Sequence, residues 1–276
     1  MDINTVESYR LARTRGDLAL APGEVIFAGG TWLMSEPQPE TSGFVDITAM
    51  DWPFLEISAD GLRIGATCPI AHLVAWAEGR GSEPVPADWP AAHLAVDGAH
   101  ALLASFKIWN AATVGGNVCR SFAAAGMVSF AVALDAVAWV WRPDGTDLRL
   151  PVSELVTGNG ENTLAAGEVL RAIEIPAYAL RSRARLQKIA LAELGRSGAV
   201  VTGRVDPDGA SVFAITAATL HPVVRRFPSL PDAAALAAAV ESAPSYYTDP
   251  LGPADWRRGV SRALAERIRI ELEAGA

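Results

Sequence analysis

The chain has few cysteines, no excess of positive charge and no long apolar run. Only two of its 276 residues are cysteine, whereas an iron–sulfur cluster or a structural zinc site normally needs about four ligands. The formal net charge is -8, and a chain that grips a phosphate backbone would show basic runs. No stretch approaches the ~20 apolar residues of a membrane span. The composition therefore argues against a cluster carrier, a nucleic-acid binder and a membrane-spanning protein.

Targeting signals and common catalytic patterns are also missing. The first residues, MDINTVESYRLARTRGD, lack the positive-then-apolar order of a signal peptide, so we expect a reducing, cytoplasmic setting. Neither G-x-G-x-x-G nor G-x-x-x-x-G-K-[ST] occurs, which leaves the usual dinucleotide and P-loop motifs unsupported. No Ser/His/Asp or Cys/His arrangement is recognisable. The histidines show no metal-ligand spacing; they are His72, His93, His100 and His221.

What the chain does have is enough apolar sequence for a large core. Half of the residues are hydrophobic and 20% are charged, which fits a two-domain globular protein. Alternating runs around Asp60–Gly61, Asp144–Gly145 and Asp208–Gly209 predict three hairpins. Helical patterns cover residues 67–79, with Thr67 as a cap, then 90–106 and 122–136. The sequence predicts an α+β fold with a domain boundary near residue 176, giving domains 1–176 and 177–276.

The last helix is predicted from one apolar stripe. Its members follow each other at i,i+4 steps, and Arg257 is among the charged residues expected mostly on the other side. The stripe consists of Trp256, Val260, Leu264, Ile268 and Leu272.

Two glycine pairs are the most suggestive local feature. Gly29–Gly30 follows a predicted strand over 24–28, and Gly115–Gly116 follows a helical pattern. Glycine lets the backbone approach a ligand closely, and successive free N–H groups form a concave anion site. Thr31, Thr113 and Asn117 add polar side chains, and only Arg120 brings a nearby charge, so two neutral cradles could share one diphosphate. A lone Gly-Gly is more often a bulge or tight turn, and the residues alone leave both interpretations open.

Five motifs together resemble a known family. AGGTWLM, RIGATCPIAHL, TVGGN, ALDA and GEVLRAIEIP occur here in the order and spacing of the FAD-binding medium subunit of molybdenum hydroxylases. That is the family of the carbon monoxide dehydrogenase flavoprotein and the flavin domain of xanthine dehydrogenase. The resemblance covers nearly the whole chain. It implies a two-subdomain FAD-binding fold of the vanillyl-alcohol-oxidase/PCMH type, divided near residues 50–60, followed by a small α+β C-terminal domain.

The resemblance also implies which residues bind FAD. The first glycine loop, residues 26–33, and the second, residues 113–117, would hold the pyrophosphate. Leu103 would line the pocket, Leu170 would lie near the flavin, and Lys188 would lie at the flavin's edge. The implied cofactor-binding residues are Ile26, Phe27, Ala28, Gly29, Gly30, Thr31, Trp32, Leu33, Leu103, Thr113, Val114, Gly115, Gly116, Asn117, Gly126, Leu170 and Lys188.

Two of these positions depart from the family pattern. Gly126 stands where the family commonly has an acidic residue that contacts FAD, and Trp32 stands where aspartate is usual. Losing a charge-assisted hydrogen bond at position 126 would weaken FAD binding by roughly tenfold to a hundredfold. Trp32 either stacks on the ligand or belongs to the core.

The function implied by the resemblance is that of an electron-transfer subunit of an oxidoreductase. FAD would accept electrons from two [2Fe–2S] clusters and pass them to an external acceptor. The clusters would belong to a small partner chain and the molybdopterin cofactor to a large one, assembled as a dimer of heterotrimers. No side chain of this chain is expected to act as a catalytic acid or base. Two alternatives stay open: a free-standing flavin oxidoreductase, with Cys119 as its one weak candidate, and a structural subunit that has lost FAD.

Overall fold

A small parallel sheet opens the chain. The computed structural model describes residues 4–102, 104–192 and 195–275. The small sheet has the order β1-β3-β2, and both outer strands run parallel to β3. Its strands are β1 (Ser8–Leu11), β2 (Glu24–Phe27) and β3 (Gly43–Asp46), with the 3-10 helices η1 (Arg15–Leu18) and η2 (Thr48–Met50) nearby. β1 was not predicted, because its residues are largely exposed and show no apolar alternation.

A five-stranded antiparallel sheet forms the centre of the molecule. Its order is β4-β5-β10-β6-β7. The strands are β4 (Leu55–Ser58), β5 (Gly61–Gly65), β6 (Val137–Trp141), β7 (Asp147–Pro151) and β10 (Val169–Pro176), and a separate two-stranded ribbon contains β8 (Val156–Gly158) and β9 (Glu161–Asn162). The β4–β5 and β6–β7 hairpins confirm the two turns predicted from Asp-Gly pairs.

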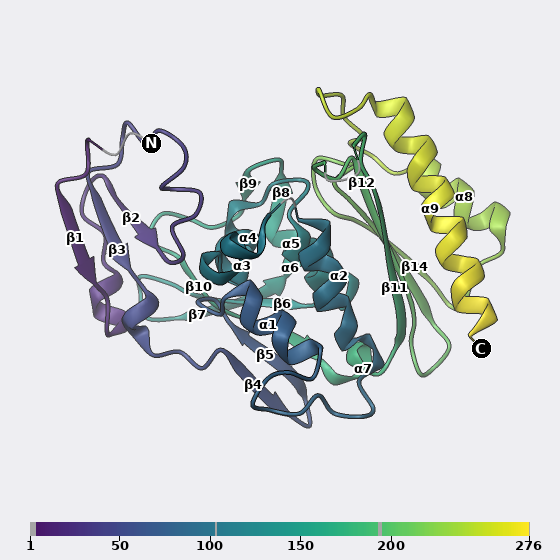
Figure 1. Ribbon diagram of the computed structural model, residues 1–276, viewed down its shortest axis with the longest axis horizontal. Coiled ribbons are helices and arrows are strands. Elements are labelled where there is room, and N and C mark those ends of the chain that lie inside the picture. The colour runs from purple at the N-terminus through teal and green to yellow at the C-terminus, as the bar shows by residue number, and fades with distance from the viewer. Residues whose placement is uncertain (1–3, 103, 193–194, 276) are drawn as a thin grey trace.

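Short helices pack around this central sheet (Figure 1). They are α1 (Ile70–Ala77), η3 (Pro90–His93), α2 (Leu94–Ala101), α3 (Phe106–Ala111), α4 (Val114–Arg120), α5 (Gly126–Ala133), α6 (Val152–Leu155) and α7 (Ala177–Leu180). Every residue of α5 is buried, which explains why its sequence, GMVSFAVA, carries no charged residue. The predicted cap at Thr67 is wrong, because α1 begins after Pro69 without a side-chain cap.

The C-terminal part is a four-stranded antiparallel sheet with two further helices. The sheet runs in the order β11-β12-β13-β14. Its elements are β11 (Arg183–Ile189), β12 (Ala199–Val205), β13 (Ser211–Thr216), β14 (Val223–Phe227), α8 (Ala233–Glu241) and α9 (Ala254–Ala274). Figure 1 shows the sheet standing between α2 and α5 on one side and α8 and α9 on the other. β13 is consequently buried along its whole length.

The long C-terminal helix follows the predicted stripe, with one exception. Leu264, Ile268 and Leu272 of α9 pack into the C-terminal core, as their spacing predicted. Arg257 is also fully buried, although the sequence pattern groups it with the exposed charges. Its guanidinium donates to the backbone carbonyls of Gly198, Ala217 and Gly252 and pairs with Asp249, so the buried charge has its hydrogen bonds.

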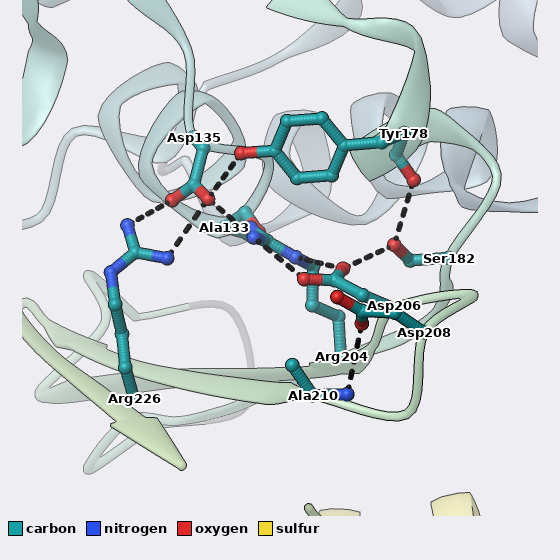
Figure 2. Close-up of polar contacts among 9 residues, drawn as sticks. All are labelled: Ala133, Asp135, Tyr178, Ser182, Arg204, Asp206, Asp208, Ala210 and Arg226. Carbon is teal, nitrogen blue, oxygen red and sulfur yellow. Dashed lines mark hydrogen bonds and ion pairs between the residues drawn. The ribbon is translucent and has the colours of Figure 1, made fainter. Parts of the chain in front are cut away.

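Arginine ion pairs connect the small sheet to the central sheet, and the end of α5 to the C-terminal sheet. From η1, Arg15 reaches the central sheet, where it donates to Asp147 over 2.9 Å and lies 4.8 Å from the centre of the Trp141 ring. Figure 2 shows the second of these connections, in which Asp135, just after α5, pairs with Arg204 of β12 and Arg226 of β14.

Within the described ranges, no helix has the length and apolar character required to cross a membrane.

The second connection fixes the charge of its carboxylate. Burial acts to raise the pKa of Asp135, but the hydrogen bonds from Arg226 and Arg204 outweigh it and lower the pKa to about 2. Tyr178 donates a further hydrogen bond to Asp135 over 2.8 Å. Asp135 is therefore ionised at neutral pH and ties the central helices to the C-terminal sheet.

Candidate functional site

A cavity of about 520 Å³ lies where the small sheet meets the central sheet and α4. Residues 26–33, 102, 104–125 and 164–170 supply most of its lining, and Arg196 contributes from the loop before β12. Aliphatic, aromatic and glycine residues make up most of this lining. The site is therefore built from stretches that are far apart in the sequence, with a mainly apolar wall and few polar groups, as is typical of a cofactor pocket.

Most of the predicted site residues line this cavity. They come from both glycine pairs and from β10, and they are Ile26, Ala28, Gly29, Gly30, Thr31, Trp32, Leu33, Thr113, Gly115, Gly116, Asn117 and Leu170.

Four described residues of the predicted set lie outside the lining. The Phe27 ring packs against those of Tyr9 and Phe44 in the small sheet, and Val114 is 1% exposed in the core. Lys188 of β11 donates through its Nζ to the carbonyl of His100 over 2.8 Å. The fourth is Gly126, which lies at a helix contact. The prediction for Leu103 lies outside the described residues.

The first glycine loop presents a row of backbone donors. The N–H groups of residues 29 to 33 have no hydrogen-bond acceptor within the described part of the chain. The loop is held by the bonds from Met34 N–H to the Gly30 carbonyl, 2.8 Å, and from Ser35 N–H to the Trp32 carbonyl, 2.9 Å. Gly30 has a φ of 66°, which glycine adopts without strain. Five successive free N–H groups beside a cavity make a site suited to an anion.

This loop also touches the start of the second glycine region. A Cβ placed on Gly29 would lie 1.8 Å from the carbonyl oxygen of Ala111, at the end of α3. Only glycine allows the loop to approach α3 so closely. The first glycine loop is thus in direct contact with the end of α3, more than eighty residues along the chain and just before the second glycine pair.

The second glycine pair is helical, not a loop. Gly115 and Gly116 lie in the first turn of α4, whose N-cap is Thr113. Gly115 N–H donates to the Ala66 carbonyl, Gly116 N–H to Thr113 Oγ1, and Asn117 N–H to the Thr113 carbonyl, each over 3.0 Å. The expectation that this pair supplies free backbone donors is therefore wrong. Its first glycine serves packing, because a Cβ on Gly115 would lie 2.6 Å from the Ala66 carbonyl oxygen.

An arginine between two aromatic rings completes one wall. The guanidinium carbon of Arg120, the last residue of α4, lies 4.5 Å from the centre of the Trp32 ring and 4.6 Å from that of Phe122. The two rings meet edge to face, 4.8 Å apart. Trp32, for which stacking and core packing both stayed open, thus lines the cavity and packs against Phe122 and Arg120. Sequence reasoning missed Phe122, because no motif marks it.

Comparison with known proteins identifies the family. The family described as FAD binding domain in molybdopterin dehydrogenase matches residues 10–178, more than half of the chain. The chain belongs to this family. The resemblance inferred from the five motifs is therefore confirmed. No curated protein sequence matches the chain.

Solved structures show the same fold along nearly the whole length of this family member. Carbon monoxide dehydrogenase from Hydrogenophaga pseudoflava is similar with a TM-score of 0.79 and 18% identity over 98% of each chain. Carbon monoxide dehydrogenase from Oligotropha carboxidovorans is similar with a TM-score of 0.81 and 19% identity over 98% of each chain. Quinoline 2-oxidoreductase from Pseudomonas putida 86 is similar with a TM-score of 0.78 and 22% identity, over 98% of this chain and 97% of that one. The mixed α+β fold, with its C-terminal sheet and helices, is confirmed.

In this family member, the position of the expected acidic residue is a point of helix contact. A Cβ on Gly126 would lie 2.1 Å from the carbonyl oxygen of Gly98, where α5 meets α2. An acidic side chain at position 126 would require α2 to move. The next residue, Met127, donates its N–H to Asn117 Oδ1 over 3.0 Å and so fixes the orientation of that amide beside the cavity.

The cavity thiol is not activated. Cys119 lines the cavity, and burial raises the pKa of its thiol to about 12. A thiol with this pKa stays protonated at neutral pH and is a poor nucleophile. Across the described ranges, no group of three or more His, Cys, Asp or Glu side chains is arranged to hold a metal ion.

Proposed function

We propose that this chain binds FAD in the cavity and serves as the electron-transfer subunit of a molybdenum-dependent dehydrogenase. The row of five free N–H groups in residues 29–33 carries the proposal, since a diphosphate requires several converging donors. Membership of an FAD-binding family supports the same ligand. The cavity, about 520 Å³, falls within the usual range of about 300–1,000 Å³ for cofactor sites.

Each part of the lining has a role in this proposal. The first glycine loop would bind the diphosphate, and Thr31 and Asn117 would add polar contacts. Leu170 and Ala28 would form part of the apolar wall for the ring system. When bound, FAD supplies the chemistry of accepting and releasing electrons. The chain itself supplies binding and orientation, and needs no side chain as an acid or base.

The remaining cofactors would belong to other chains. A [2Fe–2S] cluster normally takes four cysteine ligands, and this chain has only Cys68 and Cys119, both free. We therefore assign the clusters to a partner chain. The family resemblance implies that this partner is small, that a large partner holds the molybdopterin cofactor, and that the assembly is a dimer of heterotrimers with an external electron acceptor, which we expect in the cytoplasm. We retain domains 1–176 and 177–276, a division supported by the change from the central to the C-terminal sheet.

The visible absorption spectrum of the purified chain tests the proposal. The spectrum is recorded for the chain alone and co-expressed with candidate partners, and any released cofactor is identified by chromatography. We expect flavin bands and about one FAD per chain. A folded but colourless chain in both preparations would overturn FAD binding and favour the structural-subunit alternative.

A second measurement tests the electron-transfer role. The organic substrate of the assembly is added to the flavin-loaded chain with and without its partners. We expect the flavin band to bleach only when the partners are present. Bleaching of the isolated chain would instead identify a free-standing flavin oxidoreductase.

A further inference from the structure

The Arg120 guanidinium is a cation without an anion. Its Nε is buried and has no hydrogen-bond partner, and no carboxylate in the described ranges lies within ion-pair distance of it. Among the described lining residues the one acid is Glu168, which is already paired with Arg142 over 3.0 Å. Burial accordingly lowers the pKa of Arg120. Removing a charge from water without pairing it is costly, so an unpaired cation beside a cavity points to an anionic ligand.

Two aromatic rings hold this cation in place. With Trp32 4.5 Å away and Phe122 4.6 Å away, the guanidinium has cation–π contacts that offset part of its desolvation. These contacts are made through the flat faces of the rings and restrict the side chain to few orientations. A guanidinium fixed in this way loses less conformational entropy when it pairs with a ligand.

The same tryptophan belongs to the row of free donors. Trp32 N–H is one of the five unpaired groups of the first glycine loop, and the Trp32 ring contacts Arg120. An anion bound by that row therefore lies close to a full positive charge. Backbone N–H groups contribute only partial charges, whereas a guanidinium can donate two parallel charge-assisted hydrogen bonds to phosphate oxygens.

We propose that Arg120, clamped between Trp32 and Phe122, is the charge partner of the ligand diphosphate and selects FAD over flavins with fewer phosphates. This inference rests on the proposed function and deepens it. Position 126 cannot accept an acidic side chain without moving α2, so the acidic contact expected there is absent, and Arg120 offers the cavity a charge of the opposite sign. Arg120 would then pair with the phosphates of the ligand, and the neutral flavin ring system would bind by packing against the apolar wall of the cavity.

Dissociation constants of the cofactor-free full chain test the inference. The ligands are FAD, FMN, riboflavin and inorganic pyrophosphate, each measured at low and high salt. Arg120→Gln should raise the Kd for FAD about 10- to 100-fold and leave that for riboflavin within about twofold. It should also flatten the salt dependence of FAD binding. Lys107→Gln, which removes the same charge from an exposed position on α3 outside the lining, should change neither Kd by more than about twofold.

Two further arms keep the test decisive if Arg120→Gln does not fold. Arg120→Lys keeps the charge but not the planar fork, and should weaken FAD binding relative to the wild type by less than about 10-fold while leaving riboflavin binding within about twofold. In the wild type, FAD binding should weaken with salt while riboflavin binding does not. Equal losses for FAD and riboflavin, or no loss for either, would overturn the inference.

The pyrophosphate arm separates the inference from the proposed function. A wild type that binds no flavin would overturn FAD binding. Pyrophosphate binding that depends on Arg120 would then still support Arg120 as the diphosphate partner. A chain that binds neither flavin nor pyrophosphate would overturn both.

Discussion

The two glycine pairs look alike in sequence and differ in what their backbones do. Gly29–Gly30 lies in a loop whose N–H groups are free beside the cavity. Gly115–Gly116 lies in the first turn of α4, where the N–H groups already have acceptors in Ala66 and Thr113. The first pair thus presents donors to a ligand, and the second pair brings a helix close to the central sheet.

The difference shows that a glycine pair reports backbone proximity and not ligand binding. At Gly29 the close neighbour is the carbonyl of Ala111, and at Gly115 it is the carbonyl of Ala66. In both cases a Cβ would collide, so glycine is required in each. What decides function is whether the neighbouring N–H groups have acceptors, and that depends on the tertiary structure.

The largest expected effect comes from Gly29→Ala, which changes the first glycine pair, the one whose loop presents free N–H groups. The new Cβ would lie 1.8 Å from the Ala111 carbonyl oxygen, so the loop must move away from α3. We expect a loss of about 3 kcal/mol in the free energy of unfolding and, because the row of donors is displaced, a loss of FAD binding in the fraction that folds. Urea unfolding and FAD titration measure the two effects.

The control for Gly29→Ala is the same substitution in open space. A Cβ on Gly259 in α9 would meet no atom within 4 Å outside its own helix turn, so Gly259→Ala should gain about 0.5–1 kcal/mol of stability through helix propensity. If the two variants unfold at similar urea concentrations, the contact between the loop and α3 is not tight.

Gly115→Ala should separate stability from binding. Its Cβ would lie 2.6 Å from the Ala66 carbonyl oxygen, which costs about 2–3 kcal/mol of unfolding free energy. Because the N–H of Gly115 is already bonded, the Kd for FAD in the folded protein should change by less than about threefold. Thermal unfolding and FAD titration are the measurements.

Gly116→Ala is the matched variant for this prediction. Its Cβ would meet only the Thr113 Oγ1, a side-chain atom, at 2.8 Å, so it should be the milder of the two. A Gly115→Ala protein of normal stability that no longer binds FAD would show that the second pair contacts the ligand directly.

Much of the fold could be predicted because its signals are local. Asp-Gly turns predicted the hairpins, and the i,i+4 stripe predicted α9. α4 could not be predicted, since glycine disfavours helices and this one is fixed by the Thr113 cap and by bonds to Ala66 and Cys68. The buried Arg257 is equally invisible, because its acceptors are distant backbone carbonyls.

The candidate site was predictable to the extent that motifs mark it. Both glycine pairs and Leu170 were found from motifs and do line the cavity. Phe122 belongs to no motif, and the role inferred for Arg120 depends on two aromatic rings that only the folded chain brings together.

The smallest expected effect concerns the ion pairs of Asp135. This residue follows α5, and the other end of α5 contacts α4, the helix that contains the second glycine pair. α5 begins beside Asn117, through the Met127 N–H, and ends near Asp135. The pKa of Asp135 is about 2 in the folded chain and has an ordinary value near 3.8. Its ion pairs therefore stabilise the fold fully above about pH 4, and about 2 kcal/mol of that stability is lost as the pH falls to about 2.

Asp135→Asn tests this pH dependence and asks whether it is independent of FAD binding at the first glycine pair. The variant should lack the part of the stability loss between about pH 4 and pH 2 that the carboxylate causes, as measured by urea unfolding at each pH. At neutral pH its Kd for FAD should match the wild type, because neither Asp135 nor its arginine partners line the cavity. An unchanged pH profile would show that Asp135 does not carry the effect.

The wide spacing of the cavity lining along the chain has a consequence for biosynthesis. The wall begins at Ile26 and is completed at Arg196. At about 5–20 residues per second of translation, the first glycine loop leaves the ribosome on the order of ten seconds before the last wall residue is made. A nascent chain that exposes the loop therefore lacks the complete wall, and FAD, if it binds here as proposed, would enter only after synthesis has passed β11 and reached Arg196.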